Sequence, residues 1–504
     1  MPSFPTLEAT GWYSILPPLL AIGLSIVSRQ VVFSLLAGIW IGWVIIADWD
    51  PFAGTSAAIQ CLIDVFRDPN QTRVVIFTLL MGALLILIQQ GGGVDGFLVW
   101  VNRWRWAGTR RGAQLLAATL GLGLFLESTI TCLIVGTVAR PLFDRLRISR
   151  EKLAYICDST SAPVCMLIPV NSWGAVVLAL LATQASLENL GGRGALTMFV
   201  AAMPLNFYAI LSILLVFVVV TTGWDFGPMR RAERRACNEG QLVGTNARPV
   251  VADDVMFPTQ PTGIPPRARN LVVPLLVMVG MVAAGIAITG GTAVRQAGIA
   301  TPSLMHYLDK ASGSTAVLWG VLSALIVLVA LLRVSGAIRI RDAVYLCLRG
   351  AGAMLPIATL LALAFGIGMT CGALDTGPFI AGRLTPYLTP VFVAPLVFLV
   401  SSFIAFSTGT SFGTFAILIP LALPLAASMN LQGAEVSLPL VVSAVLGGGV
   451  FGDHCSPISD TTLISSMAAW SDHTDHVRTQ LPYALLAAGG SMMLYVITGL
   501  VLRG

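Results

Sequence analysis

The side chains with the greatest capacity for chemistry gather near the C-terminus, inside a segment that is otherwise apolar. The run GGGVFGDHCSPISDTTLISS, residues 447–466, combines two carboxylates, one imidazole and several hydroxyls. A charged side chain costs about 3 kcal/mol or more at the centre of a membrane, so the few that occur there usually bind ions, protons or substrates. The alternative is that this run forms an exposed loop. The candidate binding residues are Asp453, His454, Ser456, Asp460 and Thr461.

Asp453 and Asp460 are seven residues apart, and Pro457 lies between them. On a continuous helix this spacing would place both carboxylates on one face, about two turns apart. Pro457 lacks a backbone N–H, and together with the glycines at 447–449 it predicts an interrupted helix. We therefore expect the two acids to flank an unwound segment. Asp453 is expected to bind a cation and a proton in turn, and Asp460 to orient the segment through a neighbouring threonine or an exposed backbone amide.

A second polar run, YICDSTSAPVC at residues 155–165, lies in the first half of the chain. Because it follows a basic stretch that ends at Lys152, it could instead be an interfacial helix start that is capped by its own Asp or Ser. Three residues predict a further break in the same crossing, namely Pro169, Asn171 and Ser172. The candidate binding residues of this region are Asp158, Ser159, Thr160 and Asn171.

Two copies of the pattern S-T-x-T supply hydroxyl groups elsewhere in the chain. Hydroxyl and carbonyl oxygens suit a hard monovalent cation, although Ser and Thr in membrane helices also bond back to their own backbone. A carboxylate precedes the first copy, where the second copy has Phe406. The candidates are Glu127, Ser128, Thr129 and Thr131 in the first copy and Ser407, Thr408 and Thr410 in the second. The Na⁺ ligands that these patterns predict are Asp453, Asp158, Thr131 and Thr410.

A hydrolase is a weak alternative, although Asp453, His454 and Ser456 have the residue types of a catalytic triad. Adjacency in sequence does not indicate triad geometry, and Ser456 does not lie in a G-x-S-x-G motif. We therefore expect no enzyme and no cofactor, only transported Na⁺ and H⁺. The other histidines, His306, His473 and His476, fall in predicted loops or helix ends and are expected to be solvated.

The elements that position these residues must lie in a membrane. The 504-residue chain has 11% charged residues and a mean hydropathy of +0.85, whereas globular chains have about 25% charged residues. Its 56% hydrophobic residues are spread in blocks along the chain, which excludes a soluble enzyme and a secreted, disulfide-built protein. The basic residues lie in short clusters between these blocks, so no nucleic-acid partner is expected. The predicted class is an all-α polytopic membrane protein whose partner is the lipid bilayer.

A spanning helix needs about 20 mostly apolar residues. The candidate spans are 13–28, 31–47, 74–94, 159–187, 194–224, 270–294, 314–332, 350–374, 436–470 and 479–502. Lys and Arg in short loops favour the cytoplasm, and they flank residues 112–139 on both sides. That segment is therefore predicted to be a re-entrant hairpin that enters from the cytoplasm and returns to it.

The chain contains an internal repeat. A shift of 279 residues superposes Ser128–Thr131 on Ser407–Thr410 and Pro141 on Pro420. We predict two repeats of five transmembrane helices, each with a re-entrant hairpin and a broken helix. The charge distribution predicts that the second repeat is inverted, with its hairpin at 391–427. Inverted repeats with interrupted helices are typical of secondary transporters. The predicted units are a first repeat at 1–222, a cytoplasmic linker at 223–270 and a second repeat at 271–504.

Three runs together resemble the NhaC family of sodium/proton antiporters: residues 135–164, FSTGTSFGTFAILIP at 406–420, and VFGDHCSPISDTTLISS at 450–466. The resemblance implies sodium/proton exchange in a bacterial inner membrane. It also implies a homodimer with a scaffold domain and a moving transport domain. Relatives often carry an acidic pair and an Asn in the stretch corresponding to residues 127–131, so this chain has fewer carboxylates there.

Relatives with similar motifs exchange organic acids such as malate and lactate, or carry amino acids. A second hypothesis is therefore a Na⁺- or H⁺-coupled transporter or exchanger of a small organic acid or amino acid. In that case the N-termini of the two broken helices would face the carboxylate of the substrate. A channel is a weaker hypothesis, because two hairpins that meet at mid-membrane form an occluded site.

Overall fold

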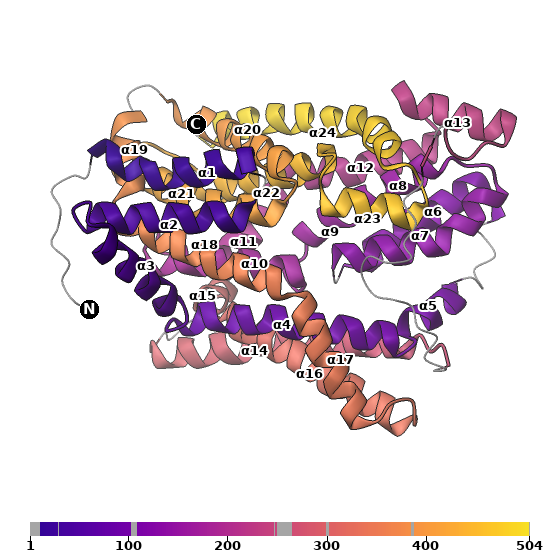
Figure 1. The fold of residues 1–504 in the computed structure, drawn as a ribbon, viewed down its shortest axis with the longest axis horizontal. Coiled ribbons are helices and arrows are strands. Elements are labelled where there is room, and N and C mark those ends of the chain that lie inside the picture. The colour runs from indigo at the N-terminus through magenta and orange to yellow at the C-terminus, as the bar shows by residue number, and fades with distance from the viewer. Residues whose placement is uncertain are drawn as a thin grey trace.

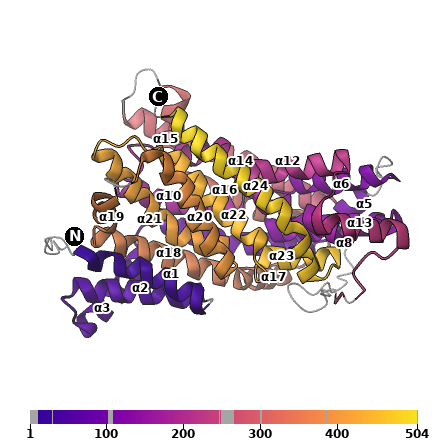
Figure 2. The ribbon, with the colours of Figure 1, turned by 90° about the horizontal axis from the view of Figure 1, so that it is seen from above.

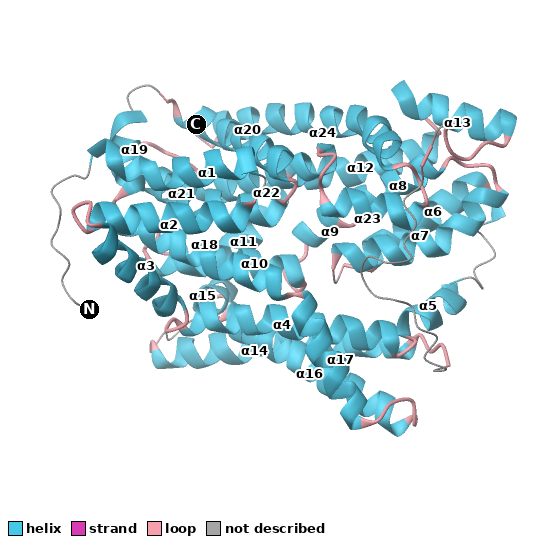
Figure 3. Ribbon diagram, in the orientation of Figure 1, coloured by secondary structure: helices cyan, strands magenta, loops and turns pink. Residues whose placement is uncertain are grey.

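The computed structural model describes residues 11–28, 30–101, 108–125, 127–245, 247–248, 265–298, 302–384 and 388–502. Within these ranges every regular element is a helix and no β-strand occurs, as Figures 1 and 3 show. The prediction of an all-α protein is confirmed. Residues 249–264 of the predicted linker lie outside the described residues.

The first half of the chain contains η1 (Gly11–Ile15), α1 (Leu16–Ser28), α2 (Val31–Ile46), α3 (Pro51–Val65), α4 (Pro69–Gln90), α5 (Gly93–Val101), α6 (Arg110–Gly123), α7 (Ser128–Arg145), α8 (Arg150–Ser159), α9 (Ala162–Met166), α10 (Ser172–Ser186), α11 (Ala195–Ala202), η3 (Met203–Leu205) and α12 (Phe207–Thr222). The predicted linker contributes α13 (Gly227–Glu239).

The second half contains α14 (Arg269–Gln296), α15 (Leu304–Lys310), α16 (Gly313–Val334), α17 (Ile340–Ala353), α18 (Leu355–Ala373), α19 (Thr376–Leu384), α20 (Pro390–Thr408), α21 (Ser411–Leu431), α22 (Leu438–Cys455), α23 (Asp460–Ala469) and α24 (His473–Val501).

Nine helices in the described part of the chain are long and apolar enough to cross a membrane. The first two predicted spans, 13–28 and 31–47, lie close to their expected bounds, as η1 followed by α1 and as α2. The helices α1 and α2 have 13 and 16 residues. At 1.5 Å per residue they are roughly 20 and 24 Å long, less than the ~30 Å of a hydrocarbon core.

Residues 112–139 form two helices, α6 and α7, instead of one straight helix. Glu127 caps the start of α7, because its side chain accepts a hydrogen bond from the backbone N–H of Ile130 at 3.1 Å. Such a cap satisfies one of the N–H groups that a helix start leaves unpaired. The predicted hairpin therefore has its turn next to the first S-T-x-T pattern.

The second predicted hairpin forms α20 and α21, which meet at Gly409 and Thr410. Gly409 has a φ of 68°, and a Cβ atom there would lie 2.6 Å from the carbonyl oxygen of Ile458. Only glycine adopts this conformation without strain and leaves room for that oxygen. Thr410 then caps α21 by accepting a hydrogen bond from the Gly413 N–H.

The polar run near the C-terminus is interrupted as predicted. The helix α22 ends at Cys455 and α23 begins at Asp460, so residues 456–459 are unwound. Asp453 lies in the last turn of α22, and Asp460 is the first residue of α23. The prediction that the two acids flank an unwound segment is confirmed.

The glycines at 447–449 do not interrupt α22, so that part of the prediction is wrong. The helix is continuous through them. A Cβ atom at Gly448 would lie 2.5 Å from the carbonyl oxygen of Phe398, and one at Gly452 would lie 2.5 Å from the Cβ of Ala405. The glycines therefore allow α22 and α20 to approach closely, which is how small residues act between membrane helices.

The first polar run is also broken, between α8 and α9 and again between α9 and α10. Asp158 lies in the last turn of α8, not at its start, and Ser149 caps that helix by accepting a hydrogen bond from the Lys152 N–H. The alternative of an interfacial helix start capped by Asp158 or Ser159 is therefore wrong.

Two pairs of elements repeat along the chain at a constant spacing. The helix α5 begins at Gly93 and α19 at Thr376, 283 residues later, and both have nine residues. The helix α7 begins at Ser128 and α21 at Ser411, again 283 residues later. The structural register of the repeat thus differs by four residues from the 279-residue shift. In the 283-residue register the two capping residues, Glu127 and Thr410, occupy equivalent positions.

The helices α4, α14, α16 and α17 pack against one another in a layer along the lower side of Figure 1. The helices α5 and α15 pack on α14 of this layer. Most of the remaining helices form a larger bundle above it, which Figure 2 shows from a second direction. In this bundle α23 packs on α7 and α8, so an element of the second half lies against two elements of the first. The candidate residues meet where these helices and α22 and α24 come together.

Candidate functional site

Asp158, at the end of α8, is the centre of a buried polar cluster and has no exposed surface. Gln480 of α24 donates its side-chain N–H to Oδ2 of Asp158 at 2.6 Å. The hydroxyls of Thr462 and Ser465, both on α23, lie 3.2 Å from Oδ2 and 3.3 Å from Oδ1 respectively. Hydrogen bonds from three side chains on two other helices therefore surround this carboxylate.

Two of these side chains also hold the end of α22. The Thr462 hydroxyl lies 3.0 Å from the carbonyl oxygen of Asp453, and Gln480 donates its second N–H to the carbonyl oxygen of His454 at 2.9 Å. A hydroxyl has one hydrogen, so Thr462 can donate either to Asp158 or to Asp453 but not to both at once. A proton on Asp158 would satisfy the remaining contact.

Asp453 is 1% exposed and faces the start of α21. Its Oδ2 accepts a hydrogen bond from the backbone N–H of Ser411 at 3.1 Å and a second, short one from the Ser411 hydroxyl. Its Oδ1 is buried and has no hydrogen-bond partner among the described residues. An unpaired carboxylate oxygen in the interior is costly unless a cation or a proton binds it.

His454 is buried beside Asp453 and is 1% exposed. Its Nδ1 lies 3.0 Å from the hydroxyl of Tyr208 on α12, and the two rings are 5.7 Å apart. Its Nε2 is buried without a hydrogen-bond partner in the part of the chain that the structure describes. Two neighbouring residues at the end of α22 thus each present one unpaired polar atom.

Asp460 has a different environment, since its side chain is exposed. Its Oδ1 accepts a hydrogen bond from the backbone N–H of Thr461 at 2.8 Å. Ser459 caps α23 by accepting a hydrogen bond from the Thr462 N–H at 3.4 Å. Asp460 thus contacts a backbone amide in the first turn of its own helix, not one in the unwound segment 456–459. Its predicted role remains a proposal.

The two hairpin turns lie on either side of Trp173, a buried residue of α10. The Trp173 indole N–H donates to the Ser128 hydroxyl at 3.2 Å, and its ring packs on Phe412 with centroids 4.6 Å apart. Glu127, Ser172 and Phe412 line a small cavity of about 20 Å³ at this place, which is room for about one water molecule. The turns therefore approach the same residue from different halves of the chain.

The remaining candidates of the first turn serve mainly to close it. The Thr131 hydroxyl lies against the carbonyl oxygens of Leu124 and Glu127 and can donate to either one, and Thr129 is half-buried. In the second turn the Thr408 hydroxyl bonds back to the carbonyl of Ile404, and Ser407 is half-buried. These contacts are the backbone bonding that Ser and Thr form in helices.

The candidates next to the breaks make local contacts. Asn171 caps α10 by accepting a hydrogen bond from Gly174 and donates to the carbonyls of Cys165 and Ile168. The Ser456 hydroxyl donates to the carbonyl of Phe406 at 2.8 Å, which joins the unwound segment to the second turn. The Thr160 hydroxyl bonds back within α8, and Ser159 is buried.

One histidine prediction is wrong, because His476 has no exposed surface. It packs inside the cluster, with Nδ1 2.8 Å from the Ser466 hydroxyl and Nε2 3.0 Å from Oε1 of Gln480. His473 is half-buried, whereas His306 is exposed as expected and takes part in capping α15. The start of α24 is covered by other helices, which sequence position did not indicate.

Several residues of the site were missed by the sequence analysis. Gln480 is polar within an apolar helix, and this could have identified it, as it identified the acids. Ser411 follows the second S-T-x-T pattern directly, but nothing in its spacing indicated a contact with Asp453. Tyr208 gave no signal, since an aromatic residue is ordinary in a membrane helix.

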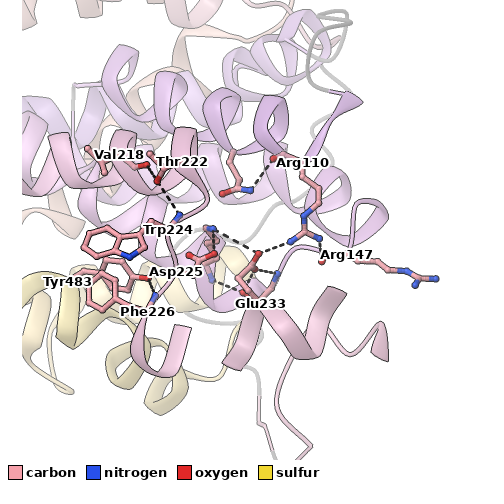
Figure 4. A network of polar contacts seen from close by, with 12 residues as sticks. Arg110, Arg147, Val218, Thr222, Trp224, Asp225, Phe226, Glu233 and Tyr483 are labelled. Atoms are coloured by element: carbon pink, nitrogen blue, oxygen red, sulfur yellow. Dashed lines mark hydrogen bonds and ion pairs between the residues drawn. The ribbon is translucent and has the colours of Figure 1, made fainter. Parts of the chain in front are cut away.

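A network of ions lies at the end of the molecule where α13 covers α8 (Figure 4). Glu233 of α13 accepts hydrogen bonds from the backbone N–H and the hydroxyl of Ser149 at 2.8 and 2.7 Å. Its other oxygen pairs with Arg110 at 2.7 Å, and Arg110 also donates to the carbonyls of Leu146 and Arg147. The linker helix thus ties the base of the first hairpin to the start of α8.

Two further ion pairs reinforce this end. Lys152, which is 1% exposed, pairs with Asp225 at 2.8 Å, and Arg235 pairs with the buried Glu151 at 2.6 Å. Removing one partner of a buried pair leaves an uncompensated charge. The network therefore fixes the start of the helix whose other end carries Asp158.

Comparison with known proteins adds a relationship across most of the chain. The sequence profile of the Na⁺/H⁺ antiporter family matches residues 164–500. An uncharacterized protein of Haemophilus influenzae is 35% identical over 498 residues, which covers 98% of this chain and 92% of that protein. The malate-2H(+)/Na(+)-lactate antiporter of Bacillus subtilis is 33% identical over 144 residues, which covers 27% of this chain and 30% of that protein.

A solved structure with a similar fold is that of the YdaH transporter of Alcanivorax borkumensis. The TM-score is 0.59, the sequence identity is 14%, and 88% of each chain is covered. At this identity the likeness concerns the fold alone.

Proposed function

We propose that this chain, which belongs to the Na⁺/H⁺ antiporter family, exchanges Na⁺ for H⁺ across a bacterial inner membrane. It is a multi-pass membrane protein and a secondary transporter, and its relatives point to a transporter rather than an enzyme. The observation that carries the proposal is the pair of buried carboxylates, Asp158 and Asp453, at the ends of two interrupted helices. The second has an oxygen without a partner among the described residues.

The exchange follows from competition for these carboxylates. A carboxylate in an interior of low dielectric is stable when a cation lies beside it or when it binds a proton. A site that can satisfy its charge in either way holds Na⁺ or H⁺, but not both. Among the described residues no group of three or more His, Cys, Asp and Glu could hold a metal ion tightly, and a transported ion must also be released.

The neighbouring oxygens are suited to Na⁺, which takes hydroxyl and carbonyl ligands. The Ser411 hydroxyl already contacts Asp453, and Thr410 precedes it at the turn. The Thr462 hydroxyl lies within hydrogen-bonding distance of the Asp158 carboxylate and of the backbone carbonyl of Asp453. We assign Na⁺ to Asp453 and its neighbours, with Asp158 contributing charge. Thr131 is a less favourable Na⁺ ligand, because its hydroxyl already lies against two carbonyl oxygens.

We further propose that the two halves are inverted repeats and that their hairpins are re-entrant, as the basic residues of the sequence predicted. The constant 283-residue spacing of α5 with α19 and of α7 with α21 supports this. The layer of α4, α14, α16 and α17 would then act as the scaffold of a homodimer. Alternating access would follow from movement of the bundle that contains the two carboxylates.

Reconstitution into liposomes tests the function directly. Purified protein is expected to move protons when a Na⁺ or Li⁺ gradient is imposed at some pH between about 6 and 9, a range that includes the ordinary titration of imidazole. A pH-sensitive dye inside the vesicles reports the flux, and protein-free vesicles are the control. Vesicles that contain folded protein but show no response to either ion would exclude Na⁺/H⁺ exchange.

The second candidate function is exchange of a small organic acid, which the match to the malate-2H(+)/Na(+)-lactate antiporter supports over part of the chain. A ligand stabilises the native state by RT ln(1 + [L]/Kd). Malate, lactate and amino acids can therefore be screened for thermal stabilisation with and without Na⁺. An organic solute that stabilises the protein only with Na⁺, and that drives flux in the vesicles, would favour this candidate.

Replacing Asp460 by Asn is expected to weaken the apparent Na⁺ affinity by about three- to tenfold and to leave some transport. The exposed side chain contacts a backbone amide of α23, and such charge-assisted contacts contribute about 0.5–2 kcal/mol. The amide oxygen of Asn can still accept that hydrogen bond. The apparent KM for Na⁺ in vesicles measures the effect. Complete loss of transport would mean that Asp460 itself carries the ion or the proton.

A further inference from the structure

The residues between His473 and Asp158 form a continuous chain of hydrogen-bonding groups. His473 is half-buried, whereas His476, Gln480 and Asp158 are all fully buried. The chain runs from His473 through the Ser466 hydroxyl to His476, and from there through Gln480 to Asp158. It therefore leads from the surface of the protein to the centre of the site.

The hydrogen positions in this chain follow from what each partner can accept. The Gln480 amide donates to Asp158 and to the carbonyl of His454, so its oxygen is an acceptor and Nε2 of His476 carries a hydrogen. Nε2 of His473 lies 2.7 Å from the carbonyl oxygen of Pro457, which can only accept. Both rings therefore have their Nε2 hydrogen fixed and direct Nδ1 toward Ser466.

Ser466 cannot satisfy all of its neighbours with one hydrogen. Its oxygen lies 3.1 Å from Nδ1 of His473, 2.8 Å from Nδ1 of His476 and 2.8 Å from the carbonyl oxygen of Thr462. With both rings neutral, all three of these atoms are acceptors that face a single hydroxyl hydrogen. If one ring gains a proton at Nδ1, it donates to the Ser466 oxygen, and the hydroxyl hydrogen is free for a second partner.

We propose that His473, Ser466 and His476 form a proton-binding site and that a proton bound there competes with Na⁺ for the charge of Asp158. The proposal rests on the Na⁺/H⁺ exchange proposed above and adds a second place for the transported proton. When the His473 ring passes its Nδ1 proton to Ser466, the hydroxyl hydrogen moves to Nδ1 of His476, so the proton count is unchanged. The imidazolium of His476 then polarises Gln480, which donates to Asp158.

The charged groups near His476 are of both signs, and the buried one is a carboxylate. On α8 the facing charge is Asp158, which interacts electrostatically with His476. On its own helix the nearby ionisable residues are His473, Asp475 and the exposed Arg478, and Asp472 caps the helix start. Arg140 of α7 and Arg150 of α8 lie over the ring of Trp470 just before α24. The buried partner of an imidazolium at His476 is thus the carboxylate that would otherwise balance Na⁺.

Equilibrium Na⁺ binding to the purified full-length protein tests the site without relying on transport. One proton that competes with Na⁺ weakens the apparent Na⁺ affinity as the pH falls from about 8 to about 5.5, by up to about tenfold per pH unit. This competition is expected in the wild type, as measured by the Na⁺-dependent shift in Tm at each pH. His476→Gln is expected to reduce the pH dependence by the equivalent of one proton, because Gln can still donate to Gln480 but cannot bind a proton.

His473→Gln provides a second variant at the half-buried end of the chain, where misfolding is less of a concern. It is expected to change the pH dependence in the same direction, while His306→Gln, at an exposed helix cap, leaves it as in the wild type. If either cluster variant folds and keeps the wild-type pH dependence, the proton site is refuted. If the wild type shows no Na⁺-dependent shift at any pH, the proposed Na⁺/H⁺ exchange fails instead.

Discussion

Replacing Asp453 by Asn is expected to reduce Na⁺-dependent proton flux by about 100-fold or more. The Asn side chain preserves the shape and can accept the hydrogen bonds from Ser411, but it carries no charge and releases no proton. Removing one partner of a buried charge pair costs about 3–5 kcal/mol, which corresponds to a factor of 100 or more in binding. Flux in liposomes at several Na⁺ concentrations measures the loss.

The matched control is Asp64→Asn, because Asp64 pairs with Arg67 at the surface far from the site. That variant is expected to transport at the wild-type rate. The Asp453 variant must also be extracted as folded protein with a thermal transition like that of the wild type. Normal exchange by folded Asp453→Asn protein would contradict the central assignment and would make Asp158 or Glu127 the better candidate.

Replacing Asp158 by Asn is expected to abolish exchange as well, but to leave weak Na⁺ binding. An amide oxygen in the place of Oδ2 can accept from Gln480 and Thr462, and an amide nitrogen in the place of Oδ1 can donate to the Ser465 hydroxyl, so the hydrogen bonds around α8, α23 and α24 are preserved. The variant therefore has no charge at this position, as a protonated Asp158 would have none. It represents the proton-bound state only. Weak Na⁺ binding remains because Asp453 keeps its charge. A Na⁺ titration by Tm, together with flux in vesicles, separates binding from exchange.

Asp144→Asn serves as the control, since Asp144 forms a partly exposed pair with Arg150 at the end of α7. Exchange by this variant is expected within about threefold of the wild type, as for most exposed ion pairs. If Asp158→Asn exchanges Na⁺ for H⁺ normally, the carboxylate has only a structural role, and the proposed proton site at His476 loses the charge to which it couples.

Some features of this protein follow from the sequence because they depend on neighbouring residues alone. Membrane insertion is favoured segment by segment according to local hydropathy, so the helical class could be predicted without knowledge of packing. Pro457 acts on its own turn of backbone, and the break between Asp453 and Asp460 lies where it was expected. The same holds for the two turns, where Glu127 and Thr410 cap the helices that follow them.

Other features could not be predicted, because they depend on which helices pack together. Asp158 and Gln480 are 322 residues apart in sequence, and no local spacing relates them. The glycines of α22 looked like a break in isolation but are explained by the approach of α20. His476 lies near a helix start, where solvation is the usual expectation, yet its neighbours bury it. Whether a polar side chain contacts water or another side chain depends on all the contacts between helices. These contacts are known only from the tertiary structure.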